Sequence, residues 1–232
     1  MKRAVLVLCC VLFAVTALLP LGTVILLCFG CSMTLFSVPV FAIGLAVLSV
    51  CVVVLDFVVI EIDPNKTVRI LLALLLPLSL INGFWYLYVC GRVFVFGCGA
   101  ACVVCAFILT IKYAKPLWLK ITAFVLSALL AGPIGLFSFF ALFPIGQNTV
   151  VQTVASPSGK YYAEVIRSDQ GALGGDTLVN VCANWEINLL LLKIEKKPQR
   201  VYLGDWGEFE DMQIHWKDDG CIVISSVEYK IG

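Results

Sequence analysis

The chain has 232 residues, of which 61% are hydrophobic and 13% are charged, and its mean hydropathy is +1.02. Soluble chains carry about 25% charged residues, so this composition excludes an ordinary soluble protein and indicates an integral membrane protein. The formal net charge is only +1, and no basic stretch is interleaved with aromatic residues, so no nucleic-acid partner is expected.

A segment of 52 residues, from Ala4 to Leu55, contains no Asp, Glu, Lys or Arg. A helix crosses the roughly 30 Å hydrocarbon layer with about 20 apolar residues, so the segment predicts two membrane spans joined by a short turn at residues 30–32. Lys2 and Arg3 precede an apolar run, as in a signal peptide. The run continues well beyond the apolar region of such a peptide and no clean cleavage site follows, so we expect an uncleaved first span.

Three more apolar segments bring the prediction to five spans, at residues 4–29, 34–59, 69–90, 93–113 and 118–143. We therefore expect a transmembrane domain over residues 1–145, followed by a second domain over residues 149–232. Prolines within predicted spans are tolerated in membranes because neighbouring groups satisfy the freed carbonyls. The break at Gly132-Pro133 is either a hinge that lines a transport path or an ordinary kink.

The distribution of charge predicts the orientation. Residues 1–148 contain eight basic and three acidic residues, whereas residues 149–232 contain eight basic and twelve acidic residues. With a cytoplasmic N-terminus, the short loops place every basic residue of the first half except Arg92 in the cytoplasm, as the positive-inside rule prefers. Five spans then leave the C-terminal domain outside the cytoplasm, as an extracellular or periplasmic domain of a multi-pass protein.

Few polar groups fall within the predicted spans. Asp56 lies near the cytoplasmic end of the second span and is expected at the interface, close to Arg69 or Lys66. Asn82 is expected to form an interhelical hydrogen bond. Nine of the eleven cysteines lie in this half and are interpreted as small apolar residues, including the Cys102-x-x-Cys105 pair. No metal or cofactor is expected.

The C-terminal part changes to short strand-like segments separated by turns. Ser156–Gly159 predicts a turn, Asn188–Glu195 is an apolar run typical of a buried strand, and Lys217-Asp-Asp-Gly220 is a strong hairpin signal because Asp-Gly readily adopts positive φ. The predicted fold class is therefore an α+β membrane protein, with a five-helix transmembrane bundle followed by a small antiparallel β domain.

The β domain carries residues that resemble a known pattern. Ser156-Pro-Ser-Gly-Lys-Tyr161 and Met212-Gln-Ile-His-Trp-Lys-Asp-Asp-Gly220 resemble the hairpins of a β-propeller blade of the TolB class, although the chain has room for only about one blade. Together with Asp169-Gln-Gly-Ala-Leu-Gly-Gly-Asp176, they more closely resemble uncharacterised multi-span membrane proteins of Gram-positive bacteria. This resemblance implies a bacterial cell membrane and a domain like a single blade, and it implies no activity.

Two loops of the β domain are candidate binding sites, because each combines acidic residues with glycines or aromatic residues. Their candidate residues are Asp169, Gly171, Gly174, Gly175 and Asp176 in the first loop, and Asp205, Trp206, Glu208, Glu210 and Asp211 in the second. Each loop either binds a cation or a basic partner, or is an ordinary solvated connection. Cys182 and Cys221 either form a disulfide that stabilises this small domain or are two separate core thiols.

No combination of nucleophile, base and metal ligands is present in the sequence, so an enzyme is not expected. The expected function is a binding, accessory or interaction role. The β domain would contact another membrane or cell-envelope protein outside the cytoplasm, and the helices would hold it at the lipid bilayer. The alternative is a small transporter or channel-like subunit with a pathway among the proline-containing spans.

Overall fold

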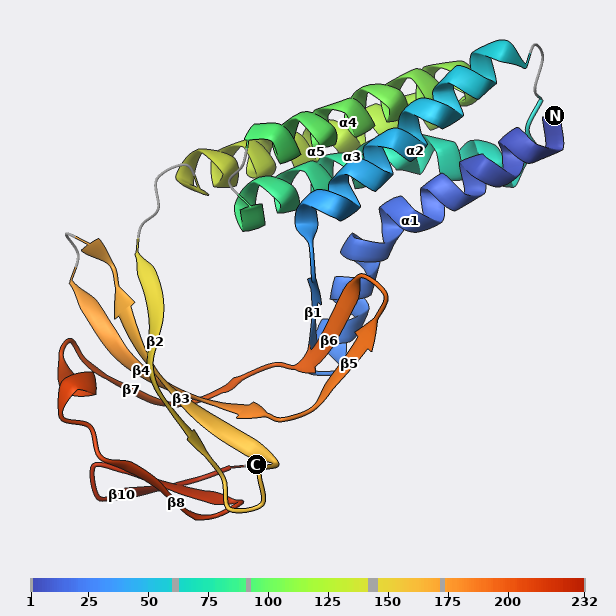
Figure 1. The fold of residues 1–232 in the computed structure, drawn as a ribbon. Helices are drawn as coiled ribbons and strands as arrows, with labels where there is room; N and C mark the ends of the chain where they lie inside the picture. Colours follow the sequence, from blue (N-terminus) through green and yellow to red (C-terminus); the bar gives the residue numbers. More distant parts are fainter. Residues whose placement is uncertain (1, 60–62, 91–92, 142–145, 172–173, 232) are drawn as a thin grey trace. The chain divides into compact units, whose positions relative to one another are not determined.

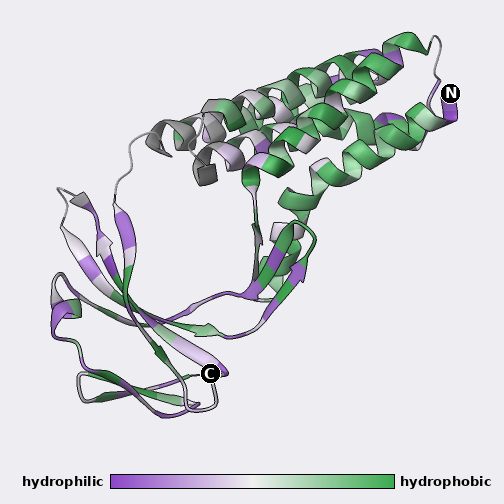
Figure 2. Cartoon of the chain, viewed as in Figure 1, coloured by the Kyte–Doolittle hydropathy of each residue, from purple (hydrophilic) through white to green (hydrophobic). Residues whose placement is uncertain are grey.

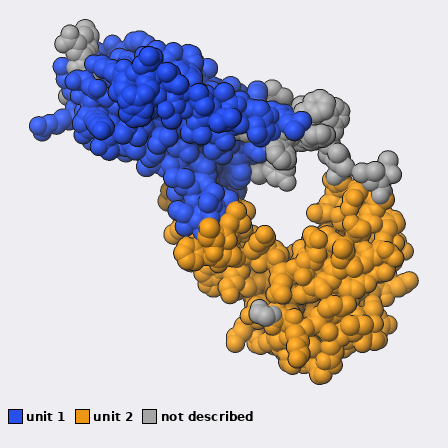
Figure 3. Space-filling model, turned by 180° about the vertical axis from the view of Figure 1, so that it is seen from behind, with its two compact units in different colours: residues 1–25, 35–142 blue, residues 26–34, 143–232 orange. Residues whose placement is uncertain are grey.

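The computed structural model describes residues 2–59, 63–90, 93–141, 146–171 and 174–231. The chain forms two compact units, which are residues 1–25 with 35–142 (unit 1) and residues 26–34 with 143–232 (unit 2) (Figure 3). The chain thus contributes to unit 2 twice, first through a short segment between two helices and then through its C-terminal part. The sequence-based division, with a boundary near residue 145, placed residues 26–34 in the first domain, whereas the structure places them in unit 2.

Five helices account for most of unit 1. They are α1 Lys2–Cys28, α2 Val38–Val58, α3 Lys66–Cys90, α4 Val93–Tyr113 and α5 Leu117–Ala141 (Figure 1). Four of them are long and apolar enough to cross a membrane, and α5 contains a shorter apolar section, Leu117–Pro133. The predicted layout of five helices followed by antiparallel β-structure is confirmed.

The helices are apolar around most of their circumference, and their charged residues lie near their ends (Figure 2). A helix of this kind is typical of a membrane span or of the core of a large protein. Local signals define two starts: Pro39 lies in the first turn of α2, and the Asn65 Oδ1 atom accepts a hydrogen bond from the Val68 amide (2.9 Å) at the start of α3.

Close helix packing in unit 1 depends on small residues. A Cβ atom on Gly99 of α4 would lie 3.1 Å from the Gly83 Cα atom of α3, so the two glycines allow the backbones of α3 and α4 to approach. The Asn82 side chain of α3 donates to the Thr16 carbonyl of α1 (2.7 Å). The predicted interhelical hydrogen bond of Asn82 is therefore confirmed.

Unit 2 contains three antiparallel groups of strands. A four-stranded sheet has the order β2-β3-β4-β7, and two three-stranded sheets have the orders β10-β9-β8 and β1-β6-β5 (Figure 1). The strands are β1 Cys31–Leu35, β2 Gln147–Ala155, β3 Tyr161–Asp169, β4 Gly175–Ala183, β5 Glu186–Leu189, β6 Leu192–Lys196, β7 Gln199–Asp205, β8 Ile214–Asp218, β9 Cys221–Ile224 and β10 Val227–Lys230.

The core of unit 2 lies between the first two of these sheets. Alternate residues of β3, β4, β8 and β9 point inward, as the two-residue period of a strand dictates. They form one buried cluster that consists of Ala163, Val165, Val179, Val181, Met212, Ile214, Ile222 and Ile224. The predicted turns at residues 156–159 and 217–220 are joined by a hydrogen bond, because the Ser158 amide donates to the Asp219 Oδ1 atom (3.0 Å).

Two segments differ from the prediction. Residues 31–35, expected as part of a turn and the start of a span, form strand β1. This strand lies beside β6, where the Lys197 amide donates to the Gly30 carbonyl (2.9 Å). The apolar run Asn188–Glu195, expected as one buried strand, belongs to a β5–β6 hairpin whose tip residue Leu190 is 98% exposed. The run is apolar in composition, but it belongs to the β1-β6-β5 sheet, whereas the buried cluster of unit 2 is formed by residues of the other two sheets and Met212.

We expect Met33→Asp to detach β1 from β6, because the Met33 side chain is buried and an unpaired carboxylate is costly in an apolar site. The bonds after Lys193 and Lys196 of β6 should then become cleavable by trypsin. Limited trypsin digestion of the purified protein measures this change.

The matched control is Thr34→Asp, which introduces the same charge at the next residue of β1, whose side chain is exposed. Equal trypsin resistance of the two variants would contradict the role assigned to β1.

Candidate functional site

The two candidate binding loops of unit 2 meet at one end of the four-stranded sheet. Asp176 of β4 is the cross-strand partner of Asp205 of β7, so the end of one loop lies directly beside the start of the other. The Thr177 hydroxyl donates to the Asp205 carbonyl (2.8 Å), and the Gln170 amide donates to the Asp176 carboxylate (2.8 Å). The structure therefore brings together two loops that are separated in the sequence.

At this end of the sheet, Arg167 contacts the aromatic rings of Trp206 and Phe209. The Arg167 guanidinium carbon lies 4.9 Å from the centre of the Trp206 ring and 5.8 Å from that of Phe209. Its Nη2 atom also lies 3.3 Å from the Asp169 carboxylate. Arg167 was not among the candidate residues, and its position two residues before the end of β3 gave no motif by which to recognise it.

The glycines of the loops are explained by packing within the protein. A Cβ atom on Gly175 would lie 2.1 Å from the Trp206 ring, and one on Gly204 would lie 2.0 Å from the Glu208 carboxylate. Gly171 and Gly174 have φ values of +62° and +93°, which a turn with left-handed residues requires. These glycines make room for the protein's own side chains and turns.

Several carboxylates of this end are hydrogen-bonded locally. The Asp169 carboxylate accepts from the Gly171 amide (2.8 Å), and the Glu208 carboxylate accepts from the Tyr202 hydroxyl (2.5 Å), which raises the pKa of Tyr202 to about 12. Three other carboxylates form no hydrogen bond or ion pair among the described residues, namely those of Asp205, Glu210 and Asp211. Within the part of the chain that the structure describes, no group of three His, Cys, Asp or Glu residues could hold a metal ion.

Cys182 and Cys221 are free thiols in this structure, so the disulfide that the sequence left open is not formed. Cys182 lies on β4 and its Sγ atom is 3.7 Å from the Glu164 carboxylate, whereas the Cys221 Sγ atom on β9 is 3.7 Å from the Glu228 carboxylate. Burial raises the pKa of the Cys182 thiol to about 11, so this cysteine behaves as a core residue.

A second polar site lies among the helices of unit 1. The Asp56 side chain of α2 is completely buried, the Lys112 Nζ atom of α4 lies 2.8 Å from its Oδ2 atom, and the Tyr113 hydroxyl donates to its other oxygen. The Lys112 ammonium also lies 5.4 Å from the Phe57 ring centre. The expected pairing of Asp56 with Arg69 or Lys66 is therefore wrong, because α2 faces α4 at this level.

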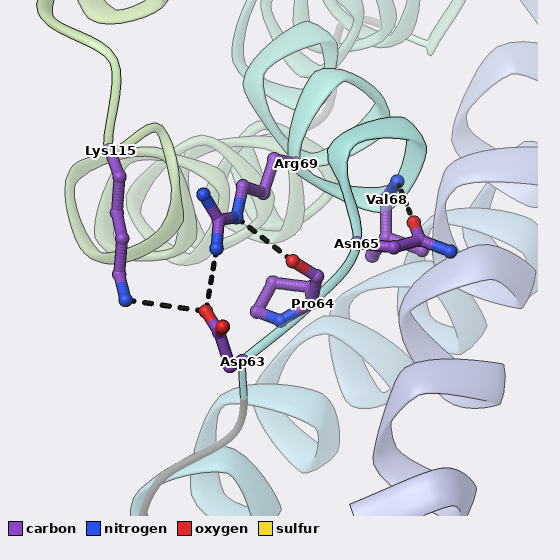
Figure 4. Close-up of polar contacts among 6 residues, drawn as sticks. All are labelled: Asp63, Pro64, Asn65, Val68, Arg69 and Lys115. Carbon is purple, nitrogen blue, oxygen red and sulfur yellow. Dashed lines mark hydrogen bonds and ion pairs between the residues drawn. The ribbon is translucent and has the colours of Figure 1, made fainter.

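Arg69 instead bonds to Asp63, in the segment that precedes α3. The Arg69 Nη2 atom lies 2.6 Å from the Asp63 carboxylate, which also lies 3.3 Å from the Lys115 Nζ atom (Figure 4). The hydrogen bonds from Lys115 and Arg69 lower the pKa of Asp63. The Arg69 Nε atom donates to the Pro64 carbonyl (2.9 Å), so this guanidinium is fixed by two bonds.

Comparisons of the chain with protein-family models, with curated proteins and with solved structures found no match. The resemblance of the β domain to membrane proteins of Gram-positive bacteria therefore stays a prediction.

We expect Lys112→Met to destabilise unit 1, because it leaves the Asp56 carboxylate buried beside Tyr113 without a counter-ion. Removal of one partner of a buried ion pair costs about 3–5 kcal/mol, and the partly exposed Lys112 places this pair near the lower limit. The midpoint of thermal unfolding of the purified protein in detergent measures the loss.

The double variant Asp56→Leu/Lys112→Met should recover most of that stability, since it removes both charges. Lys115→Met is the control, because its exposed pair with Asp63 contributes less than about 1 kcal/mol. A double variant no more stable than Lys112→Met alone would contradict this assignment.

Proposed function

We propose that this chain is an integral protein of a bacterial cell membrane with a binding or accessory role. Its five helices cross the bilayer with the N-terminus in the cytoplasm. Its β unit lies outside the cytoplasm and binds an extended segment of another membrane or cell-envelope protein along strand β2.

The outer faces of the helices support the membrane part of the proposal. Large apolar side chains are exposed along α1, α2, α4 and α5, for example Val24, Val47, Phe94 and Leu129. Exposure of so many large apolar side chains along the helices is unfavourable in water and favourable in lipid. Lipid is thus the partner that these faces fit.

The pairing of β1 with β6 supports the number of crossings. Paired strands lie on the same side of a membrane, so the chain between them must cross an even number of times. Helices α2, α3, α4 and α5 lie between β1 and β6. If α2, α3 and α4 cross, α5 must cross as well, although its apolar section is shorter. Helix α1 makes the fifth crossing, which puts the N-terminus on the side opposite the β unit.

Strand β2 is the observation that carries the binding role. It is an edge strand of the four-stranded sheet, and among the described strands it pairs only with β3. Its sequence from Gln147 to Ala155 has no charge and no proline, and nearly all of it is exposed, including Val150 (48%) and Val151 (43%). Soluble proteins protect such an edge with charges or proline, because its free backbone groups pair readily with another strand.

An extended polypeptide segment is the ligand that this edge fits. Addition of a strand satisfies the unpaired backbone groups, and alternate side chains supply the selectivity. The bulge between Val150 and Gln152 interrupts the register, so the added strand would pair with either side of the bulge more easily than with the whole strand.

A transporter or channel-like subunit is the second candidate, and one observation favours it. The Asn82 Oδ1 atom and the Tyr86 hydroxyl are buried one helical turn apart on α3, without a hydrogen-bond partner among the described residues. A polar solute passing between the helices would supply such a partner. Against this, the charges of Asp56 and Lys112 already neutralise each other.

We expect a tag after Gly232 to be removed by an external protease in intact cells, or in spheroplasts where an outer membrane is present, whereas a tag before Met1 is protected. Five crossings with a cytoplasmic N-terminus produce this result, and immunoblotting measures it. A protected C-terminal tag together with a cleaved N-terminal tag would reverse the proposed orientation.

We expect a photoreactive amino acid at Val151 to form a cross-link to a partner protein in intact cells. Val150→Lys should reduce this cross-link at least fivefold, because a charged lysine on an edge strand disfavours the addition of another strand. Cross-linked species are measured by immunoblotting and identified by mass spectrometry.

Val227 provides the matched control, since it lies on β10, an edge strand of another sheet, and is 53% exposed. The same photoreactive residue at Val227 should capture less of the partner. Equal capture at both positions would contradict the binding role of β2, and capture of a second copy of this chain would identify β2 as a self-association edge.

A further inference from the structure

A pocket of about 530 Å³ lies in unit 1 where α3 and α5 begin. One side is formed by the first residues of α3 and the segment before it, including Lys66. Figure 4 shows Asp63, Pro64, Asn65 and Arg69 of this side. The other side is formed by Pro116, Trp118 and Leu119 from the start of α5. Its size is in the range of pockets that hold small ligands.

The charge of the pocket favours an anion. Lys66, Arg69 and Lys115 are basic, and Asp63 is the only acidic residue among those that line the pocket or bond to them in the described chain, which leaves a net charge of about +2. Lys66 has no acidic partner among the described residues. The Asp63 carboxylate already lies between Arg69 and Lys115, so these two cations are positioned to contact negatively charged oxygen atoms.

Lys115 does not line the pocket itself, but its ammonium group reaches Asp63, which does, and this weak pair can be exchanged for a second anion. Its pair with Asp63 is 3.3 Å long and exposed on both sides, and pairs of this kind contribute little free energy. Arg69 is less exposed and is fixed by Asp63 and Pro64. We therefore expect Lys66 and Lys115 to contact an added anion directly, whereas Arg69 provides charge from a fixed position.

The surroundings favour a lipid as the source of the anion. The pocket lies at the ends of helices that we propose to span the bilayer, on the same side as the N-terminus. Trp118, which lines the pocket, is more than half exposed, and the neighbouring residue Leu117 is also exposed. Tryptophan is enriched at membrane interfaces. Basic pockets at the cytoplasmic ends of membrane helices are typical binding sites for anionic headgroups.

We propose that this pocket binds the phosphate group of an anionic phospholipid on the cytoplasmic side, with Lys66 and Lys115 on the phosphate and Trp118 against the adjoining glycerol and acyl region. The proposal rests on the membrane embedding proposed above. It is independent of the partner that binds to β2.

The test uses the full-length protein in a neutral detergent, titrated with dioctanoyl phosphatidylglycerol, while the midpoint of thermal unfolding is followed. Parallel titrations use dioctanoyl phosphatidylcholine and inorganic phosphate. We expect phosphatidylglycerol to raise the midpoint at concentrations at least tenfold lower than either of the other two. An equal response to phosphatidylcholine would overturn the proposal.

Lys66→Gln should weaken the apparent affinity for phosphatidylglycerol at least tenfold. Lys120→Gln is the matched control, because it removes the same charge from the start of α5, and the Lys120 side chain neither lines the pocket nor, among the described residues, bonds to a residue that lines it. A basic residue near an anionic surface accounts for about a fivefold effect by itself. Equal losses in the two variants would indicate diffuse electrostatic attraction and overturn the site.

Trp118→Ala separates the two sources of phosphate. It should weaken binding of phosphatidylglycerol severalfold without any change of charge, and Trp118→Phe should restore much of it. If inorganic phosphate acts as strongly as the lipid and Trp118→Ala has no effect, the site binds free phosphate and the lipid proposal fails. Reconstitution into phosphatidylcholine nanodiscs tests membrane embedding separately, since it requires no anionic lipid.

Discussion

The pairing of strand β1 with β6 is the constraint on which the arrangement of this chain depends. It joins residues far apart in the sequence, as the contact between Ser32 and the Glu195 carbonyl shows, and it builds unit 2 from two separate pieces of chain. The polar backbone between α1 and α2 obtains hydrogen-bond partners from this pairing, such as Lys197 for the Gly30 carbonyl. In a membrane, the same pairing would require an even number of crossings between β1 and β6.

Polar groups within the helical unit are satisfied mainly by the protein itself. The hydroxyls of Ser49 and Ser127 donate to carbonyls one turn earlier in their own helices, and the Thr110 hydroxyl of α4 donates to the Leu72 carbonyl of α3 (3.1 Å). Asp56 obtains its counter-ion from the neighbouring helix. Such internal hydrogen bonding is what the proposed lipid environment would require, because a buried polar group without a partner costs several kcal/mol there.

The acidic and aromatic end of the four-stranded sheet shows how a binding motif can serve packing. Trp206 and Phe209 contact Arg167, and Gly175 exists as glycine because the Trp206 ring occupies the space of a side chain. The unusual surface of unit 2 is instead strand β2, which is an exposed edge strand without a charged residue. The acidic and aromatic loops were recognised from their composition, whereas the unpaired backbone of β2 is a property that only the sheet order reveals.

The five apolar segments and the change to strand-like sequence near residue 145 were sufficient to predict five helices followed by antiparallel β-structure. These features are local, because helix length, charge-free runs and the Asp-Gly turn depend on neighbouring residues only. Three features depended on tertiary structure: the strand formed by residues 31–35, the exposed position of the apolar hairpin around Leu190, and the pairing of Asp56 with Lys112. The first and the third are contacts between distant segments, and the second depends on which strands form the core. All three are decided by which elements pack together, which no local sequence pattern records.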